Sequence, residues 1–295
     1  MNYVILDLEF NAAYSKAHHR FVNEIIEIGA VKCDEKFNII DTFSELIKPS
    51  ISKKLNPHVS KLTNISVEEL NRSHINFRSA IKGFIEFMGD SILMTWGTTD
   101  ILVLRENCTL LNDMQEVEFV KYYLNLQRFC ELALDYHDKA RQMGLSSCAE
   151  RLHIKFDEKV LHRALSDAKL SMLCLKELFE ESLFSNNIEK VGEEFFRKIT
   201  YKNTNICDLK DPLVDKKQMF MICDVCGKKA RRKSKWRLKN KAFRAKFKCG
   251  KCHREFEGRI IIKKCYDGVK IIKKTFESFK TDASNVHEDK INKIQ

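Results

Sequence analysis

Residues 3–10 read YVILDLEF, a run in which apolar side chains fill both faces of a strand while two carboxylates stand in its middle. Asp7 and Glu9 are two residues apart and therefore share one face. Two unpaired carboxylates in a half-buried strand cost on the order of several kcal/mol each, unless they protonate or a cation lies between them. The run predicts a central strand with a divalent-metal site, and oxygen ligands favour Mg²⁺ or Mn²⁺ over zinc. An edge strand whose acids face water is the alternative.

The sequence on the carboxyl side of this strand predicts an α/β domain. Two further strands follow, so the domain opens as a three-stranded meander, and after it helical spacing of apolar residues alternates with short apolar runs. The expected strands span residues 24–33, 37–49, 91–96 and 116–123, and the expected helices span residues 66–71, 77–88, 99–111, 127–143, 148–153, 164–182 and 188–199.

Three more residues carry groups suited to metal or proton chemistry. Asp100 follows the predicted strand 91–96 and opens the next helix, where sheet proteins commonly place ligand groups, although a helix N-cap would also explain it. His162 stands just before a long amphipathic helix, and Asp167 lies in the first turns of that helix, where an acid also stabilises the helix dipole. Each residue alone therefore has a structural explanation.

Taken together, these residues resemble the DEDD superfamily of 3′→5′ exonucleases, in its histidine-bearing branch. The order is Asp-x-Glu, then Asp, then His-x₄-Asp, and the supporting motifs are DLEF, EIIEIGAVK, WGTTDILVL and HRALSDA. The match covers residues 1–183. The resemblance implies a ribonuclease-H-like fold, which is a mixed sheet flanked by helices.

The same resemblance implies a mechanism. In the family, the positions of Asp7, Glu9, Asp100 and Asp167 hold two divalent ions, and the position of His162 is the general base. Two ions about 4 Å apart stabilise the attacking and leaving oxygens during in-line hydrolysis of a phosphodiester. Histidine has an ordinary pKa of about 6.5, so it accepts the proton of a water near neutral pH.

Contacts to the 3′-terminal nucleotide are also implied by resemblance. Phe10 is expected near the terminal base, and a place in the core is the alternative. Thr63 and Asn64 belong to the stretch LTNI, which matches a loop near that nucleotide. The family commonly has glycine where Asn64 stands, and asparagine tolerates the left-handed backbone best among the other residues. WGTTD and LTNI look closer to the RNA-trimming members, so RNA is slightly favoured over DNA.

Four of the eleven cysteines form two C-x-x-C pairs that are separated by 22 residues, namely Cys223, Cys226, Cys249 and Cys252. Four thiolates at such spacing predict one structural Zn²⁺, which a module this small needs in place of a large core. Four reduced thiols without metal, or His253 in place of one cysteine, are the alternatives. The β-rich runs 255–265 and 269–276 are joined by Asp-Gly and predict a hairpin, so this part resembles a zinc ribbon.

Between the two cysteine pairs, residues 227–248 hold twelve Lys and Arg and no acid, with aromatic residues interspersed. Basic side chains neutralise phosphates and aromatic rings stack on bases, so this segment predicts a loop that binds single-stranded nucleic acid. A solvated basic loop with aromatics packed on the ribbon is the alternative. The residues expected to make these contacts are Arg231, Arg232, Lys233, Lys235, Trp236, Arg237 and Phe243.

Charge is divided unevenly along the 295 residues. Residues 1–200 hold 25 Lys and Arg against 30 Asp and Glu, whereas residues 201–295 hold 27 against 11. A strongly basic second part favours a polyanionic partner, although a Lys-rich proteome would give a similar bias. No apolar run approaches the roughly 20 residues of a membrane span, and the first residues lack a signal-peptide pattern. We therefore expect no membrane partner and a cytoplasmic location.

The sequence thus predicts a metal-dependent 3′→5′ exonuclease that trims single-stranded nucleic acid. An inactive exonuclease-like nucleic-acid-binding protein and a DNA-polymerase proofreading exonuclease are the alternatives. The expected domains are an exonuclease domain at residues 1–183, a helix and linker at 184–218, a zinc-ribbon nucleic-acid-binding module at 219–280 and a flexible tail at 281–295.

Overall fold

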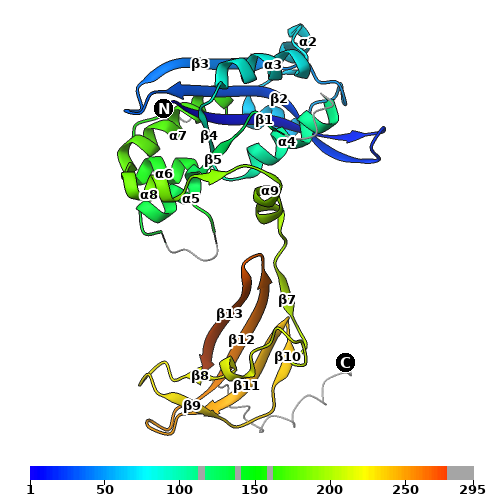
Figure 1. Cartoon of the computed structure of the whole chain (residues 1–295). Coiled ribbons are helices and arrows are strands. Elements are labelled where there is room, and N and C mark those ends of the chain that lie inside the picture. Colours follow the sequence, from blue (N-terminus) through cyan, green and yellow to red (C-terminus); the bar gives the residue numbers. More distant parts are fainter. Residues whose placement is uncertain (112–116, 137–140, 158–161, 278–295) are drawn as a thin grey trace, which may run out of the picture. The chain divides into compact units, whose positions relative to one another are not determined.

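A computed structural model of the chain describes residues 1–111, 117–136, 141–157 and 162–277 (Figure 1). The chain divides into two compact units, Met1–Ile199 and Thr200–Gln295. The tail expected at residues 281–295 lies outside the described residues. Within the described ranges, no helix is both long and apolar enough to cross a bilayer.

The first unit is built on one mixed sheet of six strands (Figure 1). Its strands are β1 (Tyr3–Ser15), β2 (Arg20–Cys33), β3 (Ile39–Leu46), β4 (Ile92–Thr95), β5 (Tyr122–Asn125) and β6 (Glu189–Lys190). Their order is β3-β2-β1-β4-β5-β6, with β4 and β5 parallel to β1 and the other neighbours antiparallel. The α/β mixed sheet that the sequence predicts is confirmed, and its first strand lies at the centre.

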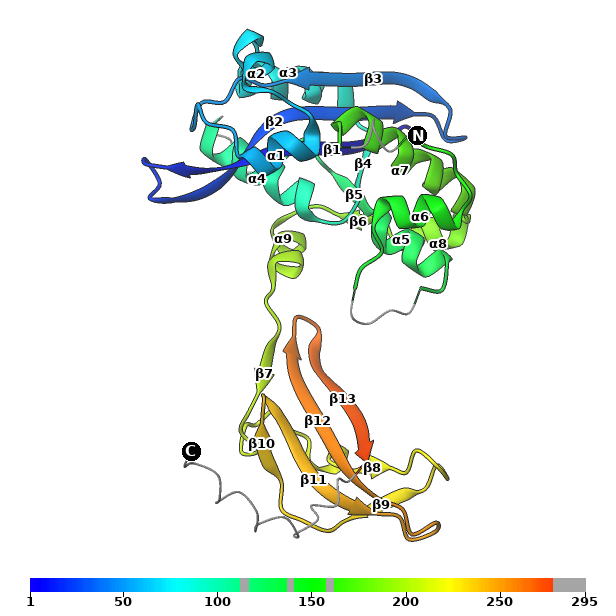
Figure 2. The ribbon, with the colours of Figure 1, turned by 180° about the vertical axis from the view of Figure 1, so that it is seen from behind.

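Helices cover both faces of this sheet (Figure 2). One buried cluster joins a face of β1 and β2 to α3 and α4, and the second joins the opposite face to α5, α6 and α7. The helices are α1 (Pro57–Thr63), α2 (Val67–Arg72), α3 (Phe77–Met88), α4 (Thr99–Leu111), α5 (Leu126–Ala133), α6 (Leu145–Arg151), α7 (Ala164–Leu178), α8 (Glu181–Asn186) and α9 (Glu193–Thr200).

Three predicted elements differ from the structure for local reasons, and a fourth, the helix expected at 188–199, begins only at Glu193 because Glu189–Lys190 pair with β5 as β6. The strand expected at 116–123 begins only at Tyr122, because a turn closes from the N–H of Val120 to the carbonyl of Val117. The helix expected at 127–143 ends at Ala133, shortly before the left-handed Asp135. The helix expected at 164–182 is interrupted by Phe179, which has extended backbone angles and packs among other aromatic rings.

The second unit is an all-β module of seven strands and one short 3-10 turn, η1. The order is β13-β12-β11-β9-β8, with β10 paired to β11 and β7 paired to β12. The elements are β7 (Thr204–Ile206), η1 (Lys216–Gln218), β8 (Met221–Ile222), β9 (Lys229–Arg232), β10 (Arg237–Lys239), β11 (Ala242–Lys248), β12 (Glu255–Cys265) and β13 (Gly268–Glu277). The predicted hairpin after the second cysteine pair is β12–β13.

The structure divides the segment 184–218, expected as helix and linker, between the two units. β6 extends the first sheet, and Phe195 and Phe196 of α9 are buried in the first core. Residues after Thr200 belong to the second unit, because β7 pairs with β12 and Val214 packs in the second core. The sequence missed this division because the polar stretch 201–217 shows no period of its own.

Close approach of backbone at Gly29 fixes how α7 sits on the sheet. A Cβ at Gly29 would lie 2.0 Å from the backbone nitrogen of Leu165 and 2.7 Å from the Cβ of Ala164. The start of α7 therefore rests directly on β2, and only glycine leaves room for it.

We predict that Gly29→Ala destabilises the first unit by about 1–3 kcal/mol or more, because the added methyl group displaces the start of α7. Denaturant unfolding followed by circular dichroism measures the change. Gly192→Ala is the matched control, since a Cβ there meets nothing within 4 Å. Equal stability of the two variants would contradict the packing at Gly29.

Candidate active site

Three carboxylates meet on the face of β1 that α7 covers. Asp7 and Glu9 lie two residues apart on β1, and Asp167 lies in the first turn of α7. One oxygen of each side chain lies within 4.8 Å of the others, which is the arrangement of ligands around a metal ion. The structure thus brings together residues that are about 160 positions apart in the sequence.

Asp100, the fourth predicted acid, is not one of these three clustered carboxylates, but its charge acts on Asp7. It lies in the first turn of α4, directly after the central strand β4, and only 7% of its surface is exposed. Burial raises the pKa of Asp100 to about 7, against hydrogen bonds from the backbone N–H groups of Asp100 and Leu8. Its charge also raises the pKa of Asp7, so the two carboxylates interact.

The group holds more negative charge than the fold can stabilise by itself. Burial, and next the charges of Asp100 and Asp167, raise the pKa of Asp7 well above its ordinary value. Burial, and next the charge of Asp167, raise the pKa of Glu9 to about 8. Burial likewise raises the pKa of Asp167. Repulsion of this kind is typical of functional sites.

An ion pair between buried Glu27 and half-buried Arg163 holds the start of α7 against β2. Arg163 donates through Nε and Nη2 to Glu27 Oε1 at 3.1 and 2.7 Å, and the backbone N–H of Ala164 donates to Glu27 Oε2 at 3.1 Å. Glu27 is 2% exposed and lies directly opposite Glu9 in the β1–β2 pair. The carboxylate of Glu27 is therefore fully engaged in positioning the helix that carries Asp167.

Glu27 and Arg163 are not among the residues that the sequence predicts for the site. The signal was present, because Glu27 interrupts the apolar run of EIIEIGAVK and Arg163 follows His162 in HRALSDA. Only the tertiary structure shows that Arg163 forms an ion pair with Glu27.

His162 lies at the entrance to α7 with a left-handed backbone, φ 67°. Its backbone N–H donates to Asp167 Oδ2 at 3.1 Å, and the residue is exposed. The imidazole therefore reaches solvent at the edge of the carboxylate group. The other oxygen, Asp167 Oδ1, is buried without a hydrogen-bond partner among the described residues.

The LTNI turn forms as expected, but one of its side chains is not available. Asn64 ends α1 with φ 55° and ψ 19°, the left-handed conformation that the sequence predicts. Thr63 is 1% exposed, and its hydroxyl donates to the carbonyl of Val59 and accepts from the N–H of Ile65. The predicted contact of the Thr63 side chain with nucleic acid is therefore wrong, because this hydroxyl closes the turn.

Phe10 packs against the core cluster of α3 and α4 while part of its ring remains exposed. Its expected contact with a terminal base stays a prediction. Leu62, in contrast, is 43% exposed at the LTNI turn, although it is a large apolar residue.

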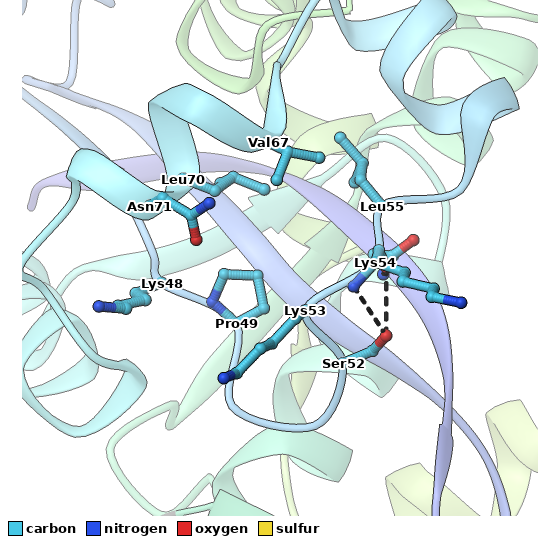
Figure 3. A pocket seen from close by; sticks show the side chains of 10 residues that line it. Lys48, Pro49, Ser52, Lys53, Lys54, Leu55, Val67, Leu70 and Asn71 are labelled. Atoms are coloured by element: carbon cyan, nitrogen blue, oxygen red, sulfur yellow. Dashed lines mark hydrogen bonds between the residues drawn. The ribbon is translucent and has the colours of Figure 1, made fainter.

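A lysine-lined pocket of about 350 Å³ lies next to β1, at Asn11 (Figure 3). Buried Asn11 donates to the carbonyl of Lys54 at 3.0 Å and accepts from the N–H of Asn56 at 2.9 Å, so β1 holds the loop that forms one wall. Glu24, opposite Asn11 on β2, accepts further hydrogen bonds from residues 50–52 of that loop. Lys48, Lys53 and Lys54 line the pocket and give it a positive charge.

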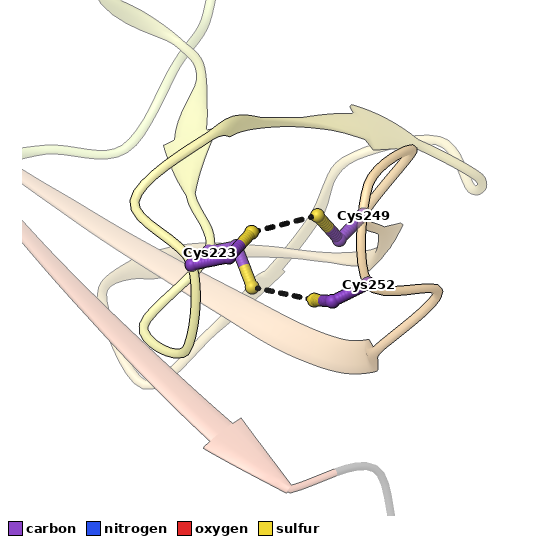
Figure 4. A group of neighbouring side chains, drawn as sticks. Cys223, Cys249 and Cys252 are labelled. Carbon is purple, nitrogen blue, oxygen red and sulfur yellow. Dashed lines mark hydrogen bonds between the residues drawn. The ribbon is translucent and has the colours of Figure 1, made fainter.

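A second candidate metal site lies in the β module. The four Sγ atoms of Cys223, Cys226, Cys249 and Cys252 lie within 4.8 Å of one another, with Cys223–Cys252 and Cys226–Cys249 at 3.5 and 3.3 Å (Figure 4). A tetrahedral zinc with Zn–S bonds of about 2.3 Å separates its sulfurs by about 3.8 Å, so the cluster fits Zn²⁺. Backbone N–H groups of Cys252 and Lys251 lower the pKa of the Cys249 thiol to about 6, which favours the thiolate that zinc requires.

The basic segment between the cysteine pairs is not a loop. Most of it forms the strands β9, β10 and β11, and only the short connections 233–236 and 240–241 lie between them. Phe243 is 3% exposed and belongs to the core of the module, so its predicted stacking on bases is wrong. Trp236 is partly buried against Phe247 at 5.7 Å, and the guanidinium of Arg232 lies 5.6 Å from its ring. The remaining predicted contacts, Arg231, Arg232, Lys233, Lys235 and Arg237, are exposed cations.

Comparisons with known proteins agree with this geometry. A model of the Exonuclease family (RNase_T) matches residues 4–175, which is more than half of the chain and includes all five predicted catalytic residues. The chain belongs to the exonuclease family. Members of this family depend on divalent metal ions.

Curated relatives match part of the chain. The probable 3′-5′ exonuclease KapD of Bacillus subtilis (strain 168) is 30% identical over 108 residues, which are 36% of this chain and 52% of KapD. DNA polymerase III PolC-type of Thermotoga maritima is 28% identical over 170 residues, 57% of this chain and 11% of the polymerase. The chain thus spans about half the length of the first curated relative and about a tenth of the polymerase.

Solved structures share the fold of the exonuclease domain. A 3′-exonuclease described in specific recognition of the histone mRNA stem-loop has a TM-score of 0.52 at 22% identity, with 65% of this chain and 91% of that chain covered. The nuclease domain of 3′hExo, a DEDDh family member bound to rAMP, has a TM-score of 0.51 at 22% identity, with 64% and 96% covered.

The residues of the first unit fit the divalent ions that the family uses. Asp167 Oδ1 is a buried acceptor without a donor, and the acids around it are held close enough to raise their own pKa values. Oxygen atoms are the ligands that Mg²⁺ and Mn²⁺ prefer. A bound cation would remove the repulsion that the fold leaves uncompensated.

We predict that Asp7→Asn stabilises the metal-free protein at pH 8. Since the pKa of Glu9 rises from 4.5 to about 8 and that of Asp100 from 3.8 to about 7, the folded state holds protons that the unfolded state has lost. Stability in EDTA should therefore fall as pH rises from about 4 to 8. Removing one charge should raise the Tm at pH 8 by about 2–4 °C, the shift expected of 1 kcal/mol in a unit of this size.

Thermal unfolding with EDTA or with Mn²⁺ measures this effect. Mn²⁺ should raise the Tm of the unsubstituted protein at pH 8 and have little effect on Asp7→Asn. Asp41→Asn, which removes an exposed acid on β3, is the control and should unfold like the unsubstituted chain. A metal-free Tm that does not depend on pH between 4 and 8 would sink the idea of mutual repulsion.

We predict one zinc ion per chain, bound by the four thiolates of the β module. Cys249→Ser should lose that zinc and the cooperative unfolding of the module, because the small core does not replace the metal. Elemental analysis of purified protein measures the metal. Cys207→Ser removes an exposed thiol outside the cluster and should retain one zinc. Equal zinc content in both variants would exclude this site.

Proposed function

We propose that this protein is a 3′→5′ exonuclease that hydrolyses phosphodiester bonds at the 3′ end of single-stranded nucleic acid, with RNA favoured over DNA. The carrying observation is the cluster of Asp7, Glu9 and Asp167 in a domain of the exonuclease family, with the charge of buried Asp100 acting on Asp7. The preference for RNA rests on the resemblance of WGTTD and LTNI to the RNA-trimming members.

The four carboxylates hold the divalent ions in this proposal. When bound, two Mg²⁺ or Mn²⁺ ions neutralise the scissile phosphate, lower the pKa of the attacking water and stabilise the leaving oxygen. Asp7 and Glu9 present their oxygens from a strand that β2 pairs at both positions and that β4 pairs just before them, over Tyr3–Leu6, so their spacing is fixed. Asp167 depends on α7, which the Glu27–Arg163 ion pair and the close packing at Gly29 hold in place.

His162 is the general base of the proposed reaction. Its imidazole takes the proton of the attacking water, a transfer that contributes about 10²–10⁴-fold to such reactions. The backbone N–H of His162 donates a hydrogen bond to Asp167, so in this proposal the base stands next to a metal ligand. An exposed side chain at this position is free to turn towards the water.

The 3′-terminal nucleotide binds between β1 and the LTNI turn in this proposal. Phe10 offers part of an aromatic ring, and the exposed residues of the turn are Leu62 and Asn64. The pocket of Lys48, Lys53 and Lys54 offers positive charge to the phosphates on the same side of β1. In this proposal Asn64 and Phe10 contact the terminal nucleotide, and the backbone of Thr63 forms part of the turn.

Proofreading of DNA is the second candidate. It is favoured by the match of 170 residues to the PolC-type polymerase of Thermotoga maritima. A role as an inactive nucleic-acid-binding protein is disfavoured, because all five residues that the resemblance implies for catalysis are present in this sequence, within the range of the family match.

We predict that the full chain shortens 5′-labelled single-stranded RNA from its 3′ end in Mg²⁺ or Mn²⁺ but not in EDTA. Asp7→Ala and Asp167→Asn should abolish this ladder, because each removes a metal ligand. His162→Ala should slow hydrolysis by about 10²–10⁴-fold without changing metal binding. A denaturing gel over time, with RNA and DNA of the same sequence, measures all three variants.

The control is Asp41→Asn, which should trim at the rate of the unsubstituted protein. A folded Asp7→Ala variant with full activity would end the proposal. Faster trimming of DNA than of RNA would support the proofreading candidate in its place.

A further inference from the structure

The strongest unassigned feature is a row of cations across one face of the second unit. In the registered strands, Arg237 of β10 lies opposite Arg244 of β11, Arg244 lies opposite Arg259 of β12, and Arg259 lies opposite Lys274 of β13. Figure 2 shows these four strands side by side. Directly opposed residues of antiparallel strands share a face, so the four side chains form one continuous row.

This face is opposite to the core of the module. Phe243, Ala245 and Phe247 of β11 point into the core, and Arg244 lies between them in the strand. On the neighbouring strand, Ile260 and Phe256 point into the core while Arg259 does not. The cation row, defined as Arg237, Arg244, Arg259 and Lys274, therefore lies on the outer face of the sheet.

The protein does not neutralise this row by itself. Like charges directly opposite one another destabilise a sheet. Arg244 donates to Glu257 at 2.7 Å, and within the described ranges no ion pair is formed by the other three cations. The Nε atoms of Arg244 and Arg259 are buried without a hydrogen-bond partner among the described residues. The row thus holds positive charge that an anionic partner would neutralise.

Apolar surface flanks the row on both sides. On the side of Glu257, Phe276 is 39% exposed, and the guanidinium of Arg244 lies 5.8 Å from its ring. On the other side, Ile261 and Ile272 lie opposite each other and are partly exposed. Cations in a line with apolar and aromatic surface beside them are typical of surfaces that bind single strands, because bases stack while phosphates pair with the cations.

The length of the row matches a nucleic-acid backbone. Neighbouring strands lie about 4.8 Å apart, so a row across four strands spans about 14 Å. A stacked strand carries one phosphate about every 3.4 Å, so the row faces about four phosphates. Arginine, which supplies three of the four cations, presents a planar fork that suits phosphate oxygens.

We propose that the cation row is a binding site for the phosphate backbone of single-stranded nucleic acid, the substrate class of the proposed function. This surface extends over β12 and β13, beyond the segment 227–248 that the sequence singles out. Trp236 and Phe243 serve the core, and the stacking surface is Phe276. The row is a substrate grip separate from the catalytic carboxylates.

The test is the binding of Arg259→Gln/Lys274→Gln to a labelled single-stranded 30-mer, measured with the full chain carrying Asp7→Ala, without chelator, so that no hydrolysis occurs and the zinc module stays intact. The double variant should bind about tenfold more weakly at 0.1 M salt. The slope of log affinity against log salt should decrease by about 1.4, which is 0.7 for each lost phosphate contact. Zinc content and circular dichroism establish that the variant is folded.

Lys216→Gln/Lys217→Gln is the charge-matched control. Both lysines are exposed in the same unit, in η1 and outside the row. This variant should keep the salt slope of the unsubstituted protein. Equal loss in both double variants, or none in either, would overturn the proposal. Binding of polyglutamate but not of the oligonucleotide would also overturn it, since the row would then fit an acidic protein.

Hydrolysis of a trinucleotide separates this proposal from the proposed function. The row variant should cleave the trinucleotide at the rate of the unsubstituted protein and have a raised KM for the 30-mer alone. If no protein cleaves either substrate while the row variant still loses affinity, the enzyme proposal fails and the row proposal stands. If cleavage proceeds and affinity is unchanged, the reverse holds.

Discussion

Mutual repulsion among buried carboxylates is the constraint on which the first unit depends. Asp7 and Glu9 point from the central strand towards α7, and burial together with the charge of Asp167 raises the pKa of each. A fold selected for stability alone would place apolar side chains here, as it does at Ile5 on the same face. The destabilisation is local and is concentrated where a cation binds, which is the pattern of a functional site.

The rest of the domain serves to keep these acids together. β2 pairs with β1 at both acids and β4 pairs with Tyr3–Leu6 just before them, so β1 cannot shift to relieve the repulsion. α7 is held by the ion pair of buried Glu27 with half-buried Arg163 and by its contact with Gly29. An uncompensated loss of either partner of a buried pair is costly, so the same interactions that position Asp167 also contribute to stability. Packing and function are therefore coupled at this helix.

The second unit has only a small core. Its core is a small set of aromatic and aliphatic side chains around Phe247 and Phe256, which stack at 5.7 Å. Such a core contributes little stability in a small module. The four clustered cysteines form a site that fits a metal ion, and a bound ion would add to the stability of the module. With the inner face committed to the core, the outer face of β10–β13 is left to carry charge. In the two proposals, the first unit carries the catalytic carboxylates and the second unit binds nucleic acid on the outer face of its sheet.

The sequence alone determined what depends on local spacing. Alternation in YVILDLEF placed Asp7 and Glu9 on one face, and the paired C-x-x-C motifs defined the cysteine cluster. The tertiary structure alone decided what depends on long-range register. It placed Phe243 in the core, engaged the Thr63 hydroxyl in its own turn, joined Glu27 to Arg163 and aligned Arg259 with Lys274. The physical reason is that periodicity fixes which face a residue shares with its near neighbours, whereas the contacts across that face come from strands and helices distant in the chain.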